Sequence, residues 1–134
     1  MSKKNVGVGF VGGGFITGFH IKSWEAVRDS DILGIYDPIT KNAENCATLA
    51  KSLHVGDAKV YGSITDMVAD PTIDAIWICS PNYTRIDVME EIVNAIESGK
   101  GQLIGVACEK PLGRNVAEAK KMLDGTYSLD QIAE

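Results

Sequence analysis

The sequence VGVGFVGGGFITGFH, from Val6 to His20, predicts a buried strand, a glycine turn and the start of a helix. Gly12 suits the tight turn, and Gly14 has no Cβ to keep the backbone away from a phosphate oxygen. The first N–H groups of a helix that begins here have no partner within the helix and would face an anion. The stretch therefore predicts a turn that binds a pyrophosphate group.

Thr17 stands where the G-x-G-x-x-G pattern has its third glycine. A small β-branched residue still allows the helix to pack near the strand, so the pattern is weakened and not lost. On this stretch alone, a glycine-rich turn without a ligand remains an alternative. The rest of the chain decides between the two.

Length and composition favour one compact domain over residues 1–134. The chain is 45% hydrophobic, with a formal net charge of -5 and a pI near 5.0. An acidic chain is poorly suited to nonspecific binding of nucleic acid or of an anionic membrane. No apolar run is long enough to span a bilayer, and we expect no signal peptide.

The cysteines, histidines and tryptophans are predicted to pack in the fold or to face solvent. The three cysteines show no close spacing, so we expect reduced thiols in a cytoplasmic protein and no metal site. We expect His20 to pack or cap rather than act as a base, His54 to be solvated, and the two tryptophans to be core or interface residues. These residues are Cys46, Cys79, Cys108, His20, His54, Trp24 and Trp77.

Strands alternate with helical patterns along the whole chain. This alternation predicts an α/β fold with a doubly wound parallel sheet of about five βα units, in the Rossmann order 3-2-1-4-5. The predicted strands are residues 6–11, 31–37, 59–61, 73–79 and 102–109.

Apolar spacing and capping residues predict the helices between these strands. The first helix is expected to bury Ile16, Phe19, Trp24 and Val27, and the second Ala43, Cys46, Ala50 and Leu53. Ser63 is predicted to cap the third helix, Thr84 with Asp87 the fourth, and Asn115 with Glu118 the last.

Polar residues end three of the predicted strands, where ligands of such sheets bind. Asp37 ends the second strand, and its carboxylate can accept hydrogen bonds from both hydroxyls of an adenosine ribose. An ordinary acidic turn residue is the alternative. Ser80-Pro81-Asn82 and Glu109-Lys110-Pro111 end the fourth and fifth strands. The central and nicotinamide parts of a cofactor would pass these two segments.

These motifs resemble the nucleotide-binding domain of the Gfo/Idh/MocA oxidoreductase family. The glycine turn followed by His20 matches that family, as do Tyr36-Asp37-Pro38, Ser80-Pro81-Asn82-Tyr83 and Glu109-Lys110-Pro111-Leu112, in the right order. The resemblance covers about residues 6–123, with residues 124–134 as an atypical tail.

The resemblance implies a nicotinamide cofactor and hydride transfer at a hydroxyl carbon of a sugar, inositol or similar polyol. It implies that Lys110 is the catalytic residue near the reacting centre, where its ammonium group would orient the substrate hydroxyl and help it lose a proton. Glu109 would oppose deprotonation of Lys110 if the two are close. The expected cofactor-binding residues are Gly12, Gly14, Phe15, Ile16, Asp37, Ser80, Pro81, Asn82, Glu109 and Lys110.

Two departures from the family pattern leave alternatives open. Arg85 stands where many relatives have a histidine, and the family's second α/β domain is not in this sequence. The chain is therefore expected to be inactive alone, either as part of a longer dehydrogenase or as a non-catalytic dinucleotide-binding module. An S-adenosylmethionine or flavin site would fit the glycine turn but would leave Glu109-Lys110-Pro111 unexplained.

Cofactor preference and association complete the predictions. Asp37, with no arginine nearby and only Lys41 to offset its charge, should repel a 2′-phosphate, so NAD is expected and NADP disfavoured.

The fifth strand has an apolar outer edge with Leu103, Ile104, Val106 and Ala107. We expect a homo-oligomer through this edge, unless residues 127–132 fold back over it.

Overall fold

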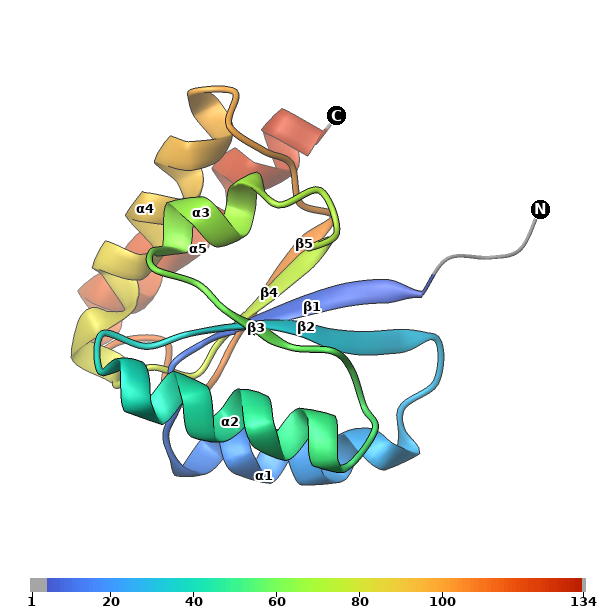
Figure 1. The fold of residues 1–134 in the computed structure, drawn as a ribbon. Helices are drawn as coiled ribbons and strands as arrows, with labels where there is room; N and C mark the ends of the chain where they lie inside the picture. Colours follow the sequence, from blue (N-terminus) through green and yellow to red (C-terminus); the bar gives the residue numbers. More distant parts are fainter. Residues whose placement is uncertain (1–4, 134) are drawn as a thin grey trace.

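The computed structural model describes the backbone of residues 5–133 and the side chains of residues 5–124. Within this part of the chain, five parallel strands form one sheet in the order β3-β2-β1-β4-β5 (Figure 1). The predicted fold class and strand order are confirmed. The strands are β1 (Val6–Val11), β2 (Ser30–Tyr36), β3 (Lys59–Val60), β4 (Ala75–Ile78) and β5 (Gly105–Cys108).

The fourth and fifth strands are shorter than predicted. The ladder between β4 and β5 begins at Ala75 and Gly105, and before it the described backbone bonds include the one from the Ile104 N–H to the Asp74 carbonyl at 2.7 Å. Ile73 is instead held in a turn, where its N–H donates to the Asp70 carbonyl at 3.0 Å. Apolar composition marked these residues as strand, but the length of the neighbouring strand sets where β5 begins.

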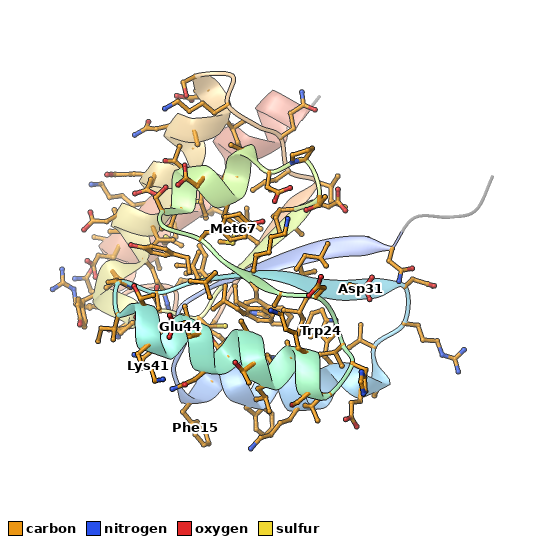
Figure 2. The ribbon with its side chains drawn as sticks, viewed as in Figure 1. Phe15, Trp24, Asp31, Lys41, Glu44 and Met67 are labelled. Atoms are coloured by element: carbon orange, nitrogen blue, oxygen red, sulfur yellow. The ribbon has the colours of Figure 1, made fainter. Side chains whose placement is uncertain are left out.

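Helices cover both faces of the sheet (Figure 1). Residues of α1 and α2 share one buried cluster with β1 and β2, and residues of α3, α4 and α5 share another with β4. The helices are α1 (Phe15–Ser23), α2 (Thr40–Ser52), α3 (Ile64–Ala69), α4 (Arg85–Glu97) and α5 (Val116–Ala133), with short 3-10 turns at Trp24–Ala26 and Asn82–Thr84. Met67 points from α3 toward the sheet (Figure 2).

Two of the three predicted helix caps are confirmed. The hydroxyl of Ser63 accepts the Asp66 N–H at 3.0 Å, and the side-chain oxygen of Asn115 accepts the Glu118 N–H at 2.9 Å. Thr84 is the N-cap residue of α4, as predicted, but its side chain makes no capping bond, because a 3-10 turn leads into the helix and Thr84 already has helical backbone angles. Its hydroxyl donates to the Pro81 carbonyl at 2.7 Å.

The predicted apolar face of the first helix is confirmed for Trp24, which is buried, and wrong for the other three residues. Ile16 and Phe19 are 43% and 60% exposed, and Val27 lies beyond the helix. The helix packs on the sheet through Thr17 and Ile21, which are both fully buried. Position 17 faces the strand, as the third glycine of the pattern does, and this sets which side of the helix is buried.

The predicted face of α2 is confirmed for Ala43, Cys46 and Ala50, which are buried. Helix α5 continues to Ala133, while the proposed cover of the sheet edge by residues 127–132 concerns side chains outside the described residues. No described helix is both long enough and apolar enough to cross a membrane.

Candidate functional site

The glycine turn lies between the ends of β2 and β4. The Gly12 N–H donates to the Tyr36 carbonyl at 2.7 Å, and the φ of Gly12 is 107°. A Cβ at this position would lie 2.8 Å from the Ser80 nitrogen, which no real side chain tolerates. The turn therefore requires glycine both for its backbone conformation and for its contact with β4.

Thr17 fastens the turn to helix α1. Its hydroxyl donates to the Gly12 carbonyl at 2.6 Å, and the side chain is fully buried. The replacement of the third glycine therefore adds a hydrogen bond while still allowing the helix to approach the strand.

The amino end of α1 is open to a ligand. A Cβ on Gly14 would meet no atom within 4 Å, and the first turn of the helix holds no acidic residue. Phe15 is 84% exposed and points away from the fold (Figure 2). The free N–H groups and the positive end of the helix dipole thus fit a pyrophosphate, with Gly14 leaving room for its oxygens.

Asp37 is held against the glycine turn from the end of β2. Its Oδ2 accepts the Gly13 N–H and its Oδ1 accepts the Ile39 N–H, both at 2.8 Å. A carboxylate has about four acceptor positions, so further hydroxyl groups can still be bound. The side chain is half-buried, which limits how far water weakens its charge. This position fits a ribose whose diphosphate lies on α1.

The predicted residues after β4 and β5 lie at the same edge of the sheet. Ser80 is buried, Asn82 is half-buried and Pro81 is exposed. The Glu109 N–H donates to the Ile78 carbonyl at 2.9 Å, which continues the pairing of the two strands. Lys110 follows as an exposed side chain. The sequence therefore placed these segments correctly, and the close approach of Gly12 to Ser80 joins them to the glycine turn.

A contact between His20 and Glu109 links helix α1 to β5, and the sequence did not predict it. The His20 Nε2 and the Glu109 Oε1 are 2.5 Å apart. The centroids of the His20 and Trp77 rings are 4.3 Å apart, which confirms the predicted packing role of His20. Because the Glu109 carboxylate contacts His20, it faces α1 instead of being free to pair with Lys110.

Donor atoms of His20, Cys79 and Glu109 lie within 4.8 Å of one another, a set that a metal ion can use. The sequence spacing could not reveal this cluster, because the residues come from three separate elements. We assign it no metal, since His20 and Glu109 already bind each other. Burial raises the pKa of the Cys79 thiol to about 12, which keeps it protonated.

Arg85 is the one charged side chain among the described buried residues. It is 5% exposed, and its Nε donates to the Ser80 carbonyl at 3.2 Å. Its Nη1 is buried without a hydrogen-bond partner. In the sequence, Arg85 was notable only because it stands where many relatives have a histidine. That difference did not predict that its side chain is buried.

The family can now be assigned from the whole chain. The profile of the oxidoreductase family with an NAD-binding Rossmann fold matches residues 6–132. The chain belongs to the Gfo/Idh/MocA family. The match extends beyond Leu123, where the resemblance seen in the sequence ends, and continues along α5 to residue 132.

Inositol dehydrogenases are among the relatives of this Gfo/Idh/MocA chain. It is 28% identical over 125 residues to the myo-inositol 2-dehydrogenase of Thermotoga maritima, a match that covers 93% of this chain and 34% of the relative. It is 30% identical to the inositol 2-dehydrogenase of Gluconacetobacter diazotrophicus, with 89% and 32% covered. The chain thus spans about a third of the length of its curated relatives.

Solved structures support the Gfo/Idh/MocA fold. The myo-inositol dehydrogenase of Lactobacillus casei in complex with NAD(H) and myo-inositol has a TM-score of 0.71 and 24% identity, over 90% of this chain and 33% of that one. A levoglucosan dehydrogenase in complex with NADH also has a TM-score of 0.71, with 22% identity over 92% of this chain and 32% of that one. The chain is accordingly the NAD-binding Rossmann domain of this family.

Proposed function

We propose that this chain is the cofactor-binding part of a dehydrogenase that moves a hydride between NAD and a hydroxyl carbon of a sugar, inositol or similar polyol. The family assignment supports the proposal, and so do the glycine turn and the polar residues at the carboxyl ends of the strands. Relatives named as dehydrogenases of inositol, levoglucosan and glucose 6-phosphate support the substrate class. The proposed activity belongs to a longer protein, because the chain spans about a third of these relatives.

The observation that carries the proposal is the bond from Gly13 to Asp37. The Oδ2 of Asp37 accepts the Gly13 N–H at 2.8 Å, which holds the glycine turn in place. The carboxylate still has acceptor positions for the hydroxyls of a ribose. We assign the pyrophosphate to Gly12, Gly14, Phe15 and Ile16 at the start of α1. The adenosine ribose is assigned to Asp37.

We assign the central and nicotinamide parts of the cofactor to the ends of β4 and β5. Their proposed contacts are Ser80, Pro81, Asn82 and Glu109. NAD, when bound, supplies the carbon that accepts or donates the hydride.

Lys110 is the proposed catalytic residue. Its side chain is exposed at the end of β5, and the neighbouring carboxylate of Glu109 contacts His20. An ammonium group that is not held by its neighbour can orient the substrate hydroxyl and help it lose its proton.

We further propose that the chain associates through the free edge of β5, in a reducing cytoplasm. The described sheet ends at β5, and Ile104 beside it is 74% exposed. Such an edge pairs readily with a second copy. The three cysteines are free thiols, which fits a reducing compartment.

Binding of NADH to a Gly14→Val variant tests the proposed site. A Cβ at this position meets no protein atom within 4 Å, so the variant should fold, but the valine side chain would occupy the space assigned to the pyrophosphate. Gly18→Ala is the matched control, because a Cβ on Gly18 also meets nothing within 4 Å. We expect NADH fluorescence titrations to show binding by wild type and Gly18→Ala and none by Gly14→Val. Unchanged binding by Gly14→Val, or no binding by wild type, would overturn the proposal.

A further inference from the structure

The ring of His20 is held in place by three aromatic neighbours. Its centroid lies 4.3 Å from that of Trp77, in β4, and 6.1 Å from that of Phe10, in β1. The ring of Phe19, its neighbour on α1, meets it edge to face at 6.5 Å. A ring packed on several sides has little freedom to turn, so the fold sets the direction in which its nitrogens point.

The Nε2 of His20 points at the carboxylate of Glu109, which follows β5. The Oε1 of Glu109 lies 2.5 Å from Nε2, and the two side chains are 20% and 22% exposed. An ionised carboxylate can only accept hydrogen bonds, so the ring nitrogen is the donor. This bond fixes one oxygen of Glu109, and the carboxylate keeps acceptor positions on Oε2 for a ligand.

Cys79 brings the Glu109 carboxylate close to the glycine turn. A Cβ on Gly12 would lie 2.9 Å from the carbonyl carbon of Cys79, so the turn touches the end of β4. The sulfur of Cys79 in turn lies within 4.8 Å of a carboxylate oxygen of Glu109. In a dinucleotide whose diphosphate lies on this turn, the second ribose is the next group. Glu109 therefore meets that ribose before it meets the nicotinamide ring.

Packing alone does not explain why position 20 carries a hydrogen-bond donor. An apolar ring would pack equally well against Phe10 and Trp77. Apolar side chains could also join α1 to β5 without the cost of partly burying the Glu109 carboxylate. The nitrogen of His20 is therefore explained by what it does to Glu109.

We propose that His20 is a positioning residue, which holds the Glu109 carboxylate so that Oε2 accepts a hydroxyl of the nicotinamide ribose. His20 acts through Glu109 and does not touch the ligand. This inference rests on the proposed function, which counts Glu109 among the cofactor contacts, and it adds the group that Glu109 binds and the residue that orients it. Glu109 would then bind the second ribose as Asp37 is proposed to bind the first.

The binding of three ligands of increasing length tests this role of His20. ADP ends at the diphosphate, ADP-ribose adds the second ribose, and NADH adds the nicotinamide ring. His20→Phe keeps a ring against Trp77 but removes the donor, whereas His20→Gln keeps a nitrogen donor at the same number of bonds from Cβ. We expect calorimetric titration to show that His20→Phe weakens the binding of ADP-ribose and of NADH by about fivefold or more. Its Kd for ADP should stay within about twofold of wild type, and His20→Gln should bind all three ligands within about twofold of wild type.

Two further variants separate this role from a general loss of affinity. Glu109→Ala should give the same losses as His20→Phe, and the double variant should lose no more than either one, because both changes remove one contact. His54→Asn is the matched control, since His54 is exposed and asparagine tolerates its φ of 58°. It should bind the three ligands as wild type does.

Equal weakening of all three ligands by His20→Phe, in a protein with wild-type circular dichroism, would show a structural role and overturn the inference. Unchanged binding would also overturn it, as would a loss confined to NADH, which would move the contact from the ribose to the nicotinamide ring. Each of these results leaves the proposed function intact. If His20→Phe does not fold, His20→Ala replaces it with the same expected losses. Failure of wild type to bind both ADP and NADH would overturn the proposed function and this inference with it.

Discussion

Replacing Asp37 by asparagine should reduce the discrimination between NADH and NADPH. The carboxylate lies at the end of β2, where a 2′-phosphate on the assigned ribose would meet it. Two unit charges about 4 Å apart repel by about 1 kcal/mol in bulk water and by more where solvent is partly excluded, as around half-buried Asp37. We therefore expect wild type to bind NADH at least about tenfold more tightly than NADPH, which corresponds to about 1.4 kcal/mol.

The Asp37→Asn substitution keeps one side-chain oxygen that can accept the Gly13 N–H, so it removes the charge and keeps the bond to the glycine turn, at the cost of the bond from the Ile39 N–H. Asp37→Ala would remove both functions and would weaken binding of both cofactors. Fluorescence titration should give a NADH to NADPH preference of less than about threefold for Asp37→Asn. Asp57→Asn, at an exposed residue before β3, is the control and should behave as wild type.

Equal or tighter binding of NADPH by wild type would refute this reasoning. So would an unchanged preference in Asp37→Asn, because the carboxylate would then lie away from the 2′ position. Lys41 is the nearby cation that would have to compensate, and it lies on the exposed side of α2 (Figure 2).

Three further predictions concern activity, stability and association. The chain alone should not produce NADH from NAD⁺ with a panel of polyols. Steady NADH production that is lost in the Lys110→Ala variant would show that this one domain is sufficient for activity. Thr17→Val should lower stability by about 1–3 kcal/mol in thermal denaturation, because it removes the buried hydroxyl bonded to Gly12, whereas exposed Thr48→Val should not. Light scattering should show self-association that Ala107→Lys, at an exposed position on β5, reduces; a wild-type monomer at high concentration would contradict the proposed edge contact.

The sequence predicted the sheet and the turn well because both depend on local patterns. The run of buried residues in β1, the glycines that follow and the carboxylate after β2 are each visible within a few positions. Parallel strands place their carboxyl ends at one edge, so the order of strands then brought Asp37, Ser80 and Glu109 together.

Contacts between distant elements could not be predicted in this way. His20 and Glu109 are separated by 89 positions, and nothing in either local pattern indicates that they meet. The face of α1 was assigned wrongly because apolar residues were assumed to be buried. Ile16 and Phe19 are exposed instead, and Ile16 lies in the first turn of α1, where the pyrophosphate is assigned. The assignment assumed that apolar side chains are buried, and exposed apolar side chains at a binding site are an exception to that assumption.

The bonds that hold the glycine turn also affect how fast a ligand can bind. Gly12 is bonded to Tyr36 and to Thr17, and Gly13 is bonded to Asp37, all within the protein itself. A turn held in this way has little conformational entropy left to lose when a ligand arrives. Association should then be limited by diffusion and orientation rather than by rearrangement of the turn. Differences in affinity between related ligands would be found mainly in how quickly each one leaves.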